Sequence, residues 1–151
     1  MPQSLGQIYV HVVYSTRSCD PFLAEGRVRR RMHAYLGGVC KHLKCIPLAI
    51  GGIEDHVHVL CKLHRTITVA DLVRIQKRES SAWIKTIDAG VPEFYWQKGY
   101  GVFSVTHSGV DEVSRYIQRQ EQIHKTRSFK EEYVRMLQAH GVAYDPDYLW
   151  D

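Results

Sequence analysis

The sequence lacks a paired-cysteine motif and a long apolar run. Its four cysteines lie between positions 19 and 61 without a Cys-x-x-Cys pair, which favours free or buried thiols over a disulfide framework. The sequence contains no run of the roughly 18 apolar residues that a transmembrane helix needs, so we expect no membrane partner. The N-terminal residues show no signal-like charged and apolar regions, and we therefore expect a cytoplasmic protein.

The excess of basic over acidic residues is also small. The chain has 20 basic and 16 acidic residues, a net charge of +4 that permits a polyanionic partner without requiring one. A length of 151 residues is typical of one domain. We therefore expect a single domain over 1–151, with a core over about 6–107 and additional helices over about 108–151.

Hydrophobic periodicity gives the order of the elements. Over 7–15 a set of apolar and aromatic residues alternates with a mixed set, which is the pattern of a strand with two distinct faces; the first set is Ile8, Val10, Val12 and Tyr14, and the second is Tyr9, His11, Val13 and Ser15. The further expected elements are strands over 45–50, 55–63 and 100–106, helices over about 21–43 and 69–87, and two later helices. This order predicts an α+β, ferredoxin-like (RRM-like) βαββαβ sandwich with an antiparallel four-stranded sheet. The C-terminal helices must then cover the other face of the sheet or pack at its edge.

Turn and capping residues set the expected boundaries. The signals are Asp20 as the N-cap of the first helix with Pro21 at its first position, Gly51-Gly52 as a turn, Thr68 as an N-cap, capping boxes at Ser108 with Asp111 and Ser128 with Glu131, and Gly141 as a helix end.

Two histidines stand out in the strand expected over 55–63. His56 and His58 are two residues apart, so both imidazoles point to the same side of the sheet. Imidazole is a common ligand of divalent metals, and two on one strand form half of a site. A half-exposed strand face with no ligand is the alternative interpretation of this pair.

The complementary half is expected on the helix that begins near Ser108. Tyr116 and Gln120 are four residues apart and share one helix face, with His124 a turn further on as a candidate outer-shell residue. Two imidazole nitrogens and a neutral amide oxygen suit Mg²⁺ or Mn²⁺ and bring no negative charge of their own. A cation there favours the Tyr116 phenolate as a nucleophile for a phosphodiester. Tyr116 as a core aromatic and Gln120 as a surface amide are the alternatives.

Several segments resemble the single-tyrosine HUH transposase family, meaning the small transposases of single-strand insertion sequences and the REP-associated tyrosine transposases. The segments are His56-Val57-His58, the block over 96–105, the helix over 116–124, the block over 128–133 and the C-terminal residues 148–151. The resemblance implies metal binding by His56, His58 and Gln120, and a 5′-phosphotyrosine intermediate on Tyr116. It also implies single-stranded DNA with a hairpin as the substrate, and a homodimer whose subunits can share active sites.

Candidate DNA contacts lie elsewhere. The helix over 69–87 carries a basic stripe of Arg74, Lys77, Arg78 and Lys85, which is either a phosphate-binding surface or a solvated face. Tyr95 and Trp96 are candidates for base stacking, although Trp96 could equally fill the core. His11 could reach the metal site from a neighbouring strand.

Three other functions share these features. A domesticated nicking enzyme would cut DNA by the same chemistry without mobilising itself. A metal-dependent hydrolase would work without a covalent step. A non-enzymatic, RRM-like binder of single strands would use aromatic residues on the central strands of the sheet.

Overall fold

The computed structural model describes residues 2–87 and 91–151, which form a four-stranded sheet flanked by helices. The strands are β1 (Ile8–Ser15), β2 (Ile46–Ile53), β3 (His56–Leu63) and β4 (Gly101–Val105). The helices are α1 (Gly26–His42), α2 (Val69–Ile84), α3 (Val110–Gln118), α4 (Gln120–Ile123) and α5 (Phe129–Ala139), with 3-10 turns η1 (Arg17–Cys19) and η2 (His107–Gly109).

The strands lie in the order β2-β3-β1-β4. β1 pairs antiparallel with both β3 and β4, and β2 pairs antiparallel with β3. This topology is that of the ferredoxin-like sandwich, so the predicted fold class is confirmed.

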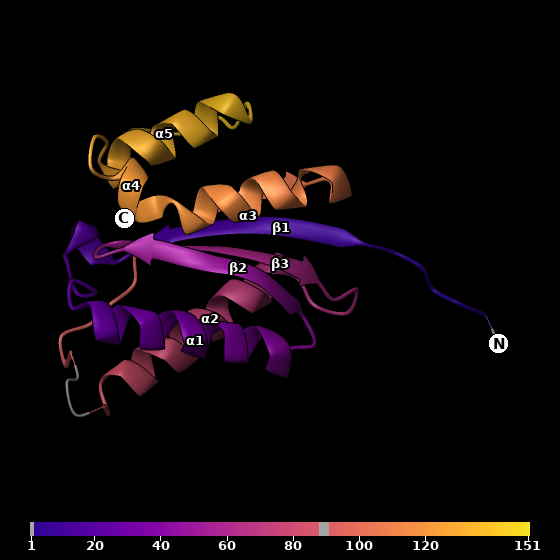
Figure 1. Cartoon of the computed structure of the whole chain (residues 1–151), viewed down its shortest axis with the longest axis horizontal. Coiled ribbons are helices and arrows are strands. Elements are labelled where there is room, and N and C mark those ends of the chain that lie inside the picture. Colours follow the sequence, from indigo (N-terminus) through magenta and orange to yellow (C-terminus); the bar gives the residue numbers. More distant parts are fainter. Residues whose placement is uncertain (1, 88–90) are drawn as a thin grey trace.

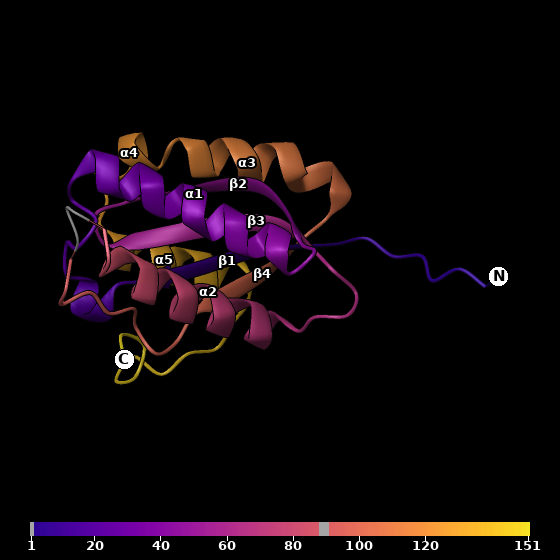
Figure 2. The ribbon, with the colours of Figure 1, turned by 90° about the horizontal axis from the view of Figure 1, so that it is seen from below.

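Helices cover both faces of the sheet. α1 and α2 lie against one face, whereas α3 and α5 lie against the other (Figure 1). Seen from below, α1 and α2 lie in front of the strands (Figure 2). Of the two placements expected for the C-terminal helices, over the second face or at the edge of the sheet, the structure shows the first.

Each face of the sheet has its own core, because successive residues of a strand point to opposite sides. Val12 and Tyr14 belong to the large core beneath α1 and α2. Val13 belongs to a smaller core with Phe103 and with Phe129 of α5. The odd-numbered residues of β1 therefore face the layer formed by α3 and α5.

The first helix begins later than Asp20-Pro21. α1 starts at Gly26, and the Glu25 carboxylate accepts hydrogen bonds from the backbone N–H groups of Arg27 and Val28. The preceding turn is held in place because Leu23 is fully buried and its N–H donates to the Glu54 carbonyl. Tertiary contacts thus override the local signal at Asp20-Pro21.

The Gly51-Gly52 pair does not form the expected turn but lies inside β2. Gly51 pairs with His58 and Gly52 with Val57, and the turn follows at residues 54–55. Gly52 has a φ of 150°, and a Cβ atom there would lie 2.2 Å from the His56 carbonyl oxygen. These glycines serve a close approach of backbone segments.

Capping was predicted correctly for α2 and α5. Thr68 accepts the N–H of Asp71, and Ser128 accepts the N–H of Glu131. The box at Ser108 is wrong, because Ser108 lies within η2 and Gly109 precedes α3 without a side-chain cap. The His140 C-cap and Gly141, with a φ of 66°, end α5 as expected.

All four cysteines are free thiols, and Cys40, Cys45 and Cys61 are buried, as the sequence predicts. Among the described residues, no helix combines the length and the apolar character needed to cross a membrane.

Candidate metal and tyrosine site

The His56–His58 pair lies at the start of the central strand β3, on the sheet face covered by α3 and α5. Both side chains are fully buried, and their ring centroids are 5.0 Å apart. The Asp55 carboxylate lies 2.8 Å from His56 Nδ1, which leaves His56 Nε2 directed into the site. The expectation that the two imidazoles share one side of the sheet is confirmed.

Gln120 reaches these histidines from a break in the expected helix. The backbone departs from helical geometry at Arg119, and α4 begins at Gln120. Gln120 Oε1 lies 2.8 Å from His56 Nε2 and 3.0 Å from His124 Nε2. The structure thus brings His124, a candidate for the outer shell, into direct contact with Gln120.

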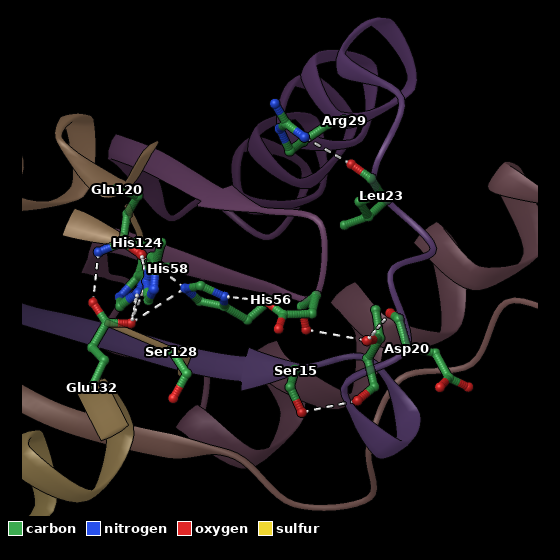
Figure 3. Close-up of polar contacts among 12 residues, drawn as sticks. Ser15, Asp20, Leu23, Arg29, His56, His58, Gln120, His124, Ser128 and Glu132 are labelled. Carbon is green, nitrogen blue, oxygen red and sulfur yellow. Dashed lines mark hydrogen bonds and ion pairs between the residues drawn. The ribbon is translucent and has the colours of Figure 1, made fainter. Parts of the chain in front are cut away.

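Glu132 was not predicted, and it lies in the middle of the site (Figure 3). Its Oε1 atom lies 3.1 Å from His58 Nε2, 3.3 Å from His56 Nε2 and 3.1 Å from His124 Nε2. The expectation of a site without negative charge is therefore wrong. The signal in the sequence was a carboxylate on the apolar face of α5, between Phe129 and Leu137.

The second oxygen of Glu132 connects the histidines to the tyrosine. Glu132 Oε2 accepts a hydrogen bond from Gln120 Nε2 at 2.7 Å and another from the Tyr116 hydroxyl. This contact turns the Gln120 amide so that Oε1 faces His56. Tyr116 lies beside the histidines of its own chain, with its ring centroid 5.8 Å from that of His58.

His11 also contacts the site, from β1. Its Nε2 atom lies 2.8 Å from His58 Nδ1, and its ring meets that of Tyr116 edge to face. Burial and the neighbouring His58 lower the pKa of His11 to about 3, so this imidazole is neutral at physiological pH.

The ionisation states follow from burial and from the shared carboxylate. Burial alone would raise the pKa of Glu132, but hydrogen bonds from His124, His56 and His58 hold it well below its usual range. Burial lowers the pKa of His56, yet its hydrogen bonds with Asp55 and Glu132 raise it to about 9. Burial lowers the pKa of His58. These shifts describe an anionic carboxylate beside a protonated His56 and a neutral His58.

The Tyr116 phenol keeps its proton in this environment. Burial and the negative charge of Glu132 both raise the pKa of Tyr116. A cation near the hydroxyl would act in the opposite direction.

The donor set suits a divalent metal ion. One ligand atom from each of His56, His58 and Glu132 lies within 4.8 Å of the others, so these three residues could hold an ion. The Gln120 oxygen points to the same place. Two imidazole nitrogens with an amide and a carboxylate oxygen are a reasonable set for Mg²⁺ or Mn²⁺.

Comparison with known proteins decides the family. The model of the family described as "Transposase IS200 like" matches residues 4–120, which include the histidine pair, Tyr116 and Gln120. The chain belongs to the IS200-like transposase family.

Two solved structures share the fold of this IS200-like transposase. One is a protein from Deinococcus radiodurans R1 assigned as a transposase, with 17% identity, a TM-score of 0.63, and coverage of 80% of this chain and 95% of that one. The other is a REP-associated tyrosine transposase bound to a REP hairpin, with 13% identity, a TM-score of 0.61, and coverage of 96% and 90%. No match is found among curated proteins.

The predicted DNA contacts of the transposase fall into two groups. Arg74 and Arg78 on α2 and Lys85 at its C-cap are exposed, and Arg74 and Arg78 pair with Asp71 and Glu79. Lys77 differs, because its ammonium donates to the carbonyls of Gln97 and Gly99 at 2.8 and 2.7 Å. Lys77 therefore stabilises the loop over residues 97–99, which precedes β4, and does not belong to an exposed basic stripe.

The two aromatic candidates also separate. Tyr95 is half exposed, and both Arg17 and Lys85 lie 4.6 Å from its ring centroid. Trp96 is buried in the core, where its indole N–H donates to Ser80. Trp96 therefore fills the core, which was the alternative to base stacking in the sequence analysis. It offers no free face on which a base could stack.

Proposed function

We propose that this transposase cleaves and rejoins single-stranded DNA through a 5′-phosphotyrosine intermediate on Tyr116, with Mg²⁺ or Mn²⁺ as the cofactor. One observation carries the proposal: the Tyr116 hydroxyl shares the Glu132 carboxylate with the His56–His58 pair. A nucleophile, an orienting carboxylate and metal-ligating nitrogens therefore meet within a single chain.

The metal ligands in this proposal are His56, His58, Gln120 and Glu132. The last replaces the expectation of an all-neutral set. A bound divalent cation supplies positive charge that favours the phenolate and polarises the phosphodiester. His124, in contact with both Gln120 and Glu132, orients these two ligands.

The contacts of Tyr116 and Glu132 suggest the part that each residue takes in strand cleavage. Glu132 Oε2 already accepts the hydrogen bond of the Tyr116 hydroxyl, so it is placed to take that proton. The phenolic oxygen attacks phosphorus and the bond from phosphorus to the 3′-oxygen breaks. The 3′-oxygen takes up one proton from water, which balances the proton lost by Tyr116, and the strand leaves with a 3′-hydroxyl. The 5′-phosphate remains on Tyr116. A second 3′-hydroxyl can reverse the exchange without ATP, because the phosphotyrosine ester conserves the bond energy.

The substrate proposed is a single strand that carries a hairpin. The REP-associated neighbour was solved with a REP hairpin, and the shared fold motivates the same class of ligand here. We also propose a homodimer, because β2 and β4 are sheet edges that a second copy could cover.

The RRM-like alternative has less support. The central strands of an RNA-recognition module present exposed aromatics. Here the corresponding face carries His11, His56 and His58, which are buried beneath helices. At these positions the central strands therefore present no exposed aromatic surface on which bases could stack.

A covalent-trapping experiment tests the proposal. The protein is incubated with a 3′-labelled single strand bearing an imperfect hairpin, with Mg²⁺ or with EDTA. We expect an adduct stable to denaturants with Mg²⁺, none with EDTA, and none for Tyr116→Phe. Cleavage that persists in Tyr116→Phe would instead support hydrolysis without a covalent step.

A further inference from the structure

We propose that His11 is a positioning residue that fixes the tautomer of His58, so that His58 presents Nε2 to the metal. The inference rests on the metal site of the proposed function. It is carried by one contact, the 2.8 Å separation between His11 Nε2 and His58 Nδ1, which lies on the side of the His58 ring away from Glu132.

The position of the proton on His58 decides which of its two nitrogens can bind a metal ion. A neutral imidazole carries one proton, and a nitrogen that binds a metal must be the other one. If His58 Nε2 is the ligand, the proton lies on Nδ1 and needs an acceptor, because the side chain is fully buried. His11 Nε2 is the atom in reach, and it accepts when the proton of His11 lies on Nδ1.

Without a metal, the same pair would favour the opposite arrangement. His58 Nε2 lies 3.1 Å from Glu132 Oε1, so a proton on Nε2 would be donated to that carboxylate. His58 Nδ1 would then accept a hydrogen bond from His11 Nε2. The two rings can shift their protons together, and the hydrogen bond between them is retained in either arrangement.

The two metal histidines are therefore oriented by different chemistry. His56 Nδ1 faces the Asp55 carboxylate, whereas His58 Nδ1 faces a neutral imidazole. A carboxylate partner increases the basicity of its histidine more than a neutral partner does. His58 should accordingly be the ligand that depends most on a correctly placed acceptor.

The fold holds His11 in this position. His58 pairs with Val13 in the β1–β3 register, and His11 lies two residues earlier on the same face. Diagonal neighbours across a strand pair are within reach of long side chains. The Phe103 and Tyr116 rings pack against His11 edge to face, which leaves it 5% exposed.

A pair of variants tests the role. Mn²⁺ binding without DNA is measured by calorimetry for wild type, His11→Leu and His11→Gln, with folding checked by circular dichroism. Leucine fills the site without an acceptor, whereas the glutamine oxygen can accept from His58 Nδ1. We expect a loss of affinity of roughly 10- to 100-fold for His11→Leu, the range seen for outer-shell partners, and recovery in His11→Gln. Equal affinity of His11→Leu and wild type, or no recovery in a folded His11→Gln, would overturn the role.

A second measurement needs no variant. Long-range ¹H–¹⁵N spectra of the Mg²⁺-loaded wild type should show His58 protonated at Nδ1 and His11 unprotonated at Nε2. A proton on His58 Nε2 in the loaded protein would overturn the inference. Failure of the wild type to bind Mn²⁺ would instead contradict the metal site of the proposed function, so the two failures are distinguishable.

Discussion

Glu132 is a buried carboxylate with contacts to three histidines, an amide and a phenol. Burying a charged carboxylate is costly unless hydrogen bonds and opposite charges compensate for the lost hydration. The histidines supply this compensation in the protein alone, and a divalent cation would supply more. The position of Glu132 explains how one side chain can contact both a metal ion at the histidines and the nucleophile Tyr116.

Replacing this carboxylate should weaken the metal site. Glu132→Gln keeps the shape of the side chain but removes its charge, so we expect Mn²⁺ affinity to fall by at least about 10-fold in calorimetry. The matched control is Glu131→Gln, one residue earlier on α5, where glutamine is also accepted in a capping box. Equal Mn²⁺ affinity in Glu132→Gln and wild type would remove Glu132 from the ligand set.

Residues of the candidate site could be predicted from the sequence where a short spacing along one strand or helix brings them to the same face. The two-residue spacing of His56 and His58 on a strand and the four-residue spacing of Tyr116 and Gln120 gave four members of the site. Glu132 was not found because it lies on a different helix from Tyr116 and Gln120, and long-range proximity leaves no local spacing in the sequence. His11 was a candidate because it could reach the site from a neighbouring strand, but its partner His58 follows only from the register of β1 and β3.

At the scale of elements, α3 lies unusually close to β2. A Cβ atom on Gly51 would lie 2.6 Å from the Ile117 carbonyl oxygen, which belongs to the α3 backbone and cannot rotate away. The glycine thus lets the helix that carries Tyr116 approach the strand next to the histidines. The absence of a side chain at position 51 is therefore part of the geometry of the site.

Gly51→Ala should displace α3 and misplace Tyr116. A shift of about 1 Å in a catalytic group can cost on the order of 100-fold in rate, so we expect adduct formation to slow by at least 10-fold. Gly38→Ala in α1 is the control, because a Cβ atom there would meet no heavy atom within 4 Å apart from its chain neighbours and the nearby backbone of its own helix. Single-turnover rates that are the same for Gly51→Ala and wild type would show that α3 tolerates the shift.

Element boundaries were the least predictable part of the fold. The start of α1 and the extent of β2 depend on contacts with residues 54–58, which local propensity does not contain. The break at Arg119 is similar, because the i and i+4 pattern of Tyr116 and Gln120 continues through it. Element order, by contrast, followed from periodicity and gave the correct topology.

At the scale of the molecule, α2, which carries Arg74 and Arg78, lies on the opposite face of the sheet from α3 and α5, which carry Tyr116 and Glu132 (Figure 1). DNA that reaches Tyr116 would have to pass round an edge to contact Arg74 and Arg78. If it does, the double variant Arg74→Ala/Arg78→Ala should weaken DNA binding at all sequences. The slope of log affinity against log salt should then fall by about 1 for each lost phosphate contact. An unchanged slope would mean that these side chains are only solvated.

The arrangement within one chain also bears on assembly. Tyr116 contacts its own chain's Glu132 and lies beside its own histidines. We therefore predict that each site takes its tyrosine from the same subunit as its histidines. The proposed homodimer would then join two complete sites. Light scattering at micromolar concentration measures the assembly state, and a monomer would contradict the dimer while leaving the site intact.

The most direct measurement is a complementation test between two inactive variants. The variants Tyr116→Phe and His58→Ala are co-expressed with different tags, and the complex is purified through both tags. If no stable dimer forms, the two purified variants are mixed instead. Adduct formation is then assayed. Because each lacks one part of a site contained in a single chain, we predict no activity from either variant or from the combination. Recovery of a substantial fraction of wild-type activity in the combination would show that the tyrosine of one subunit serves the histidines of another, and would contradict the account.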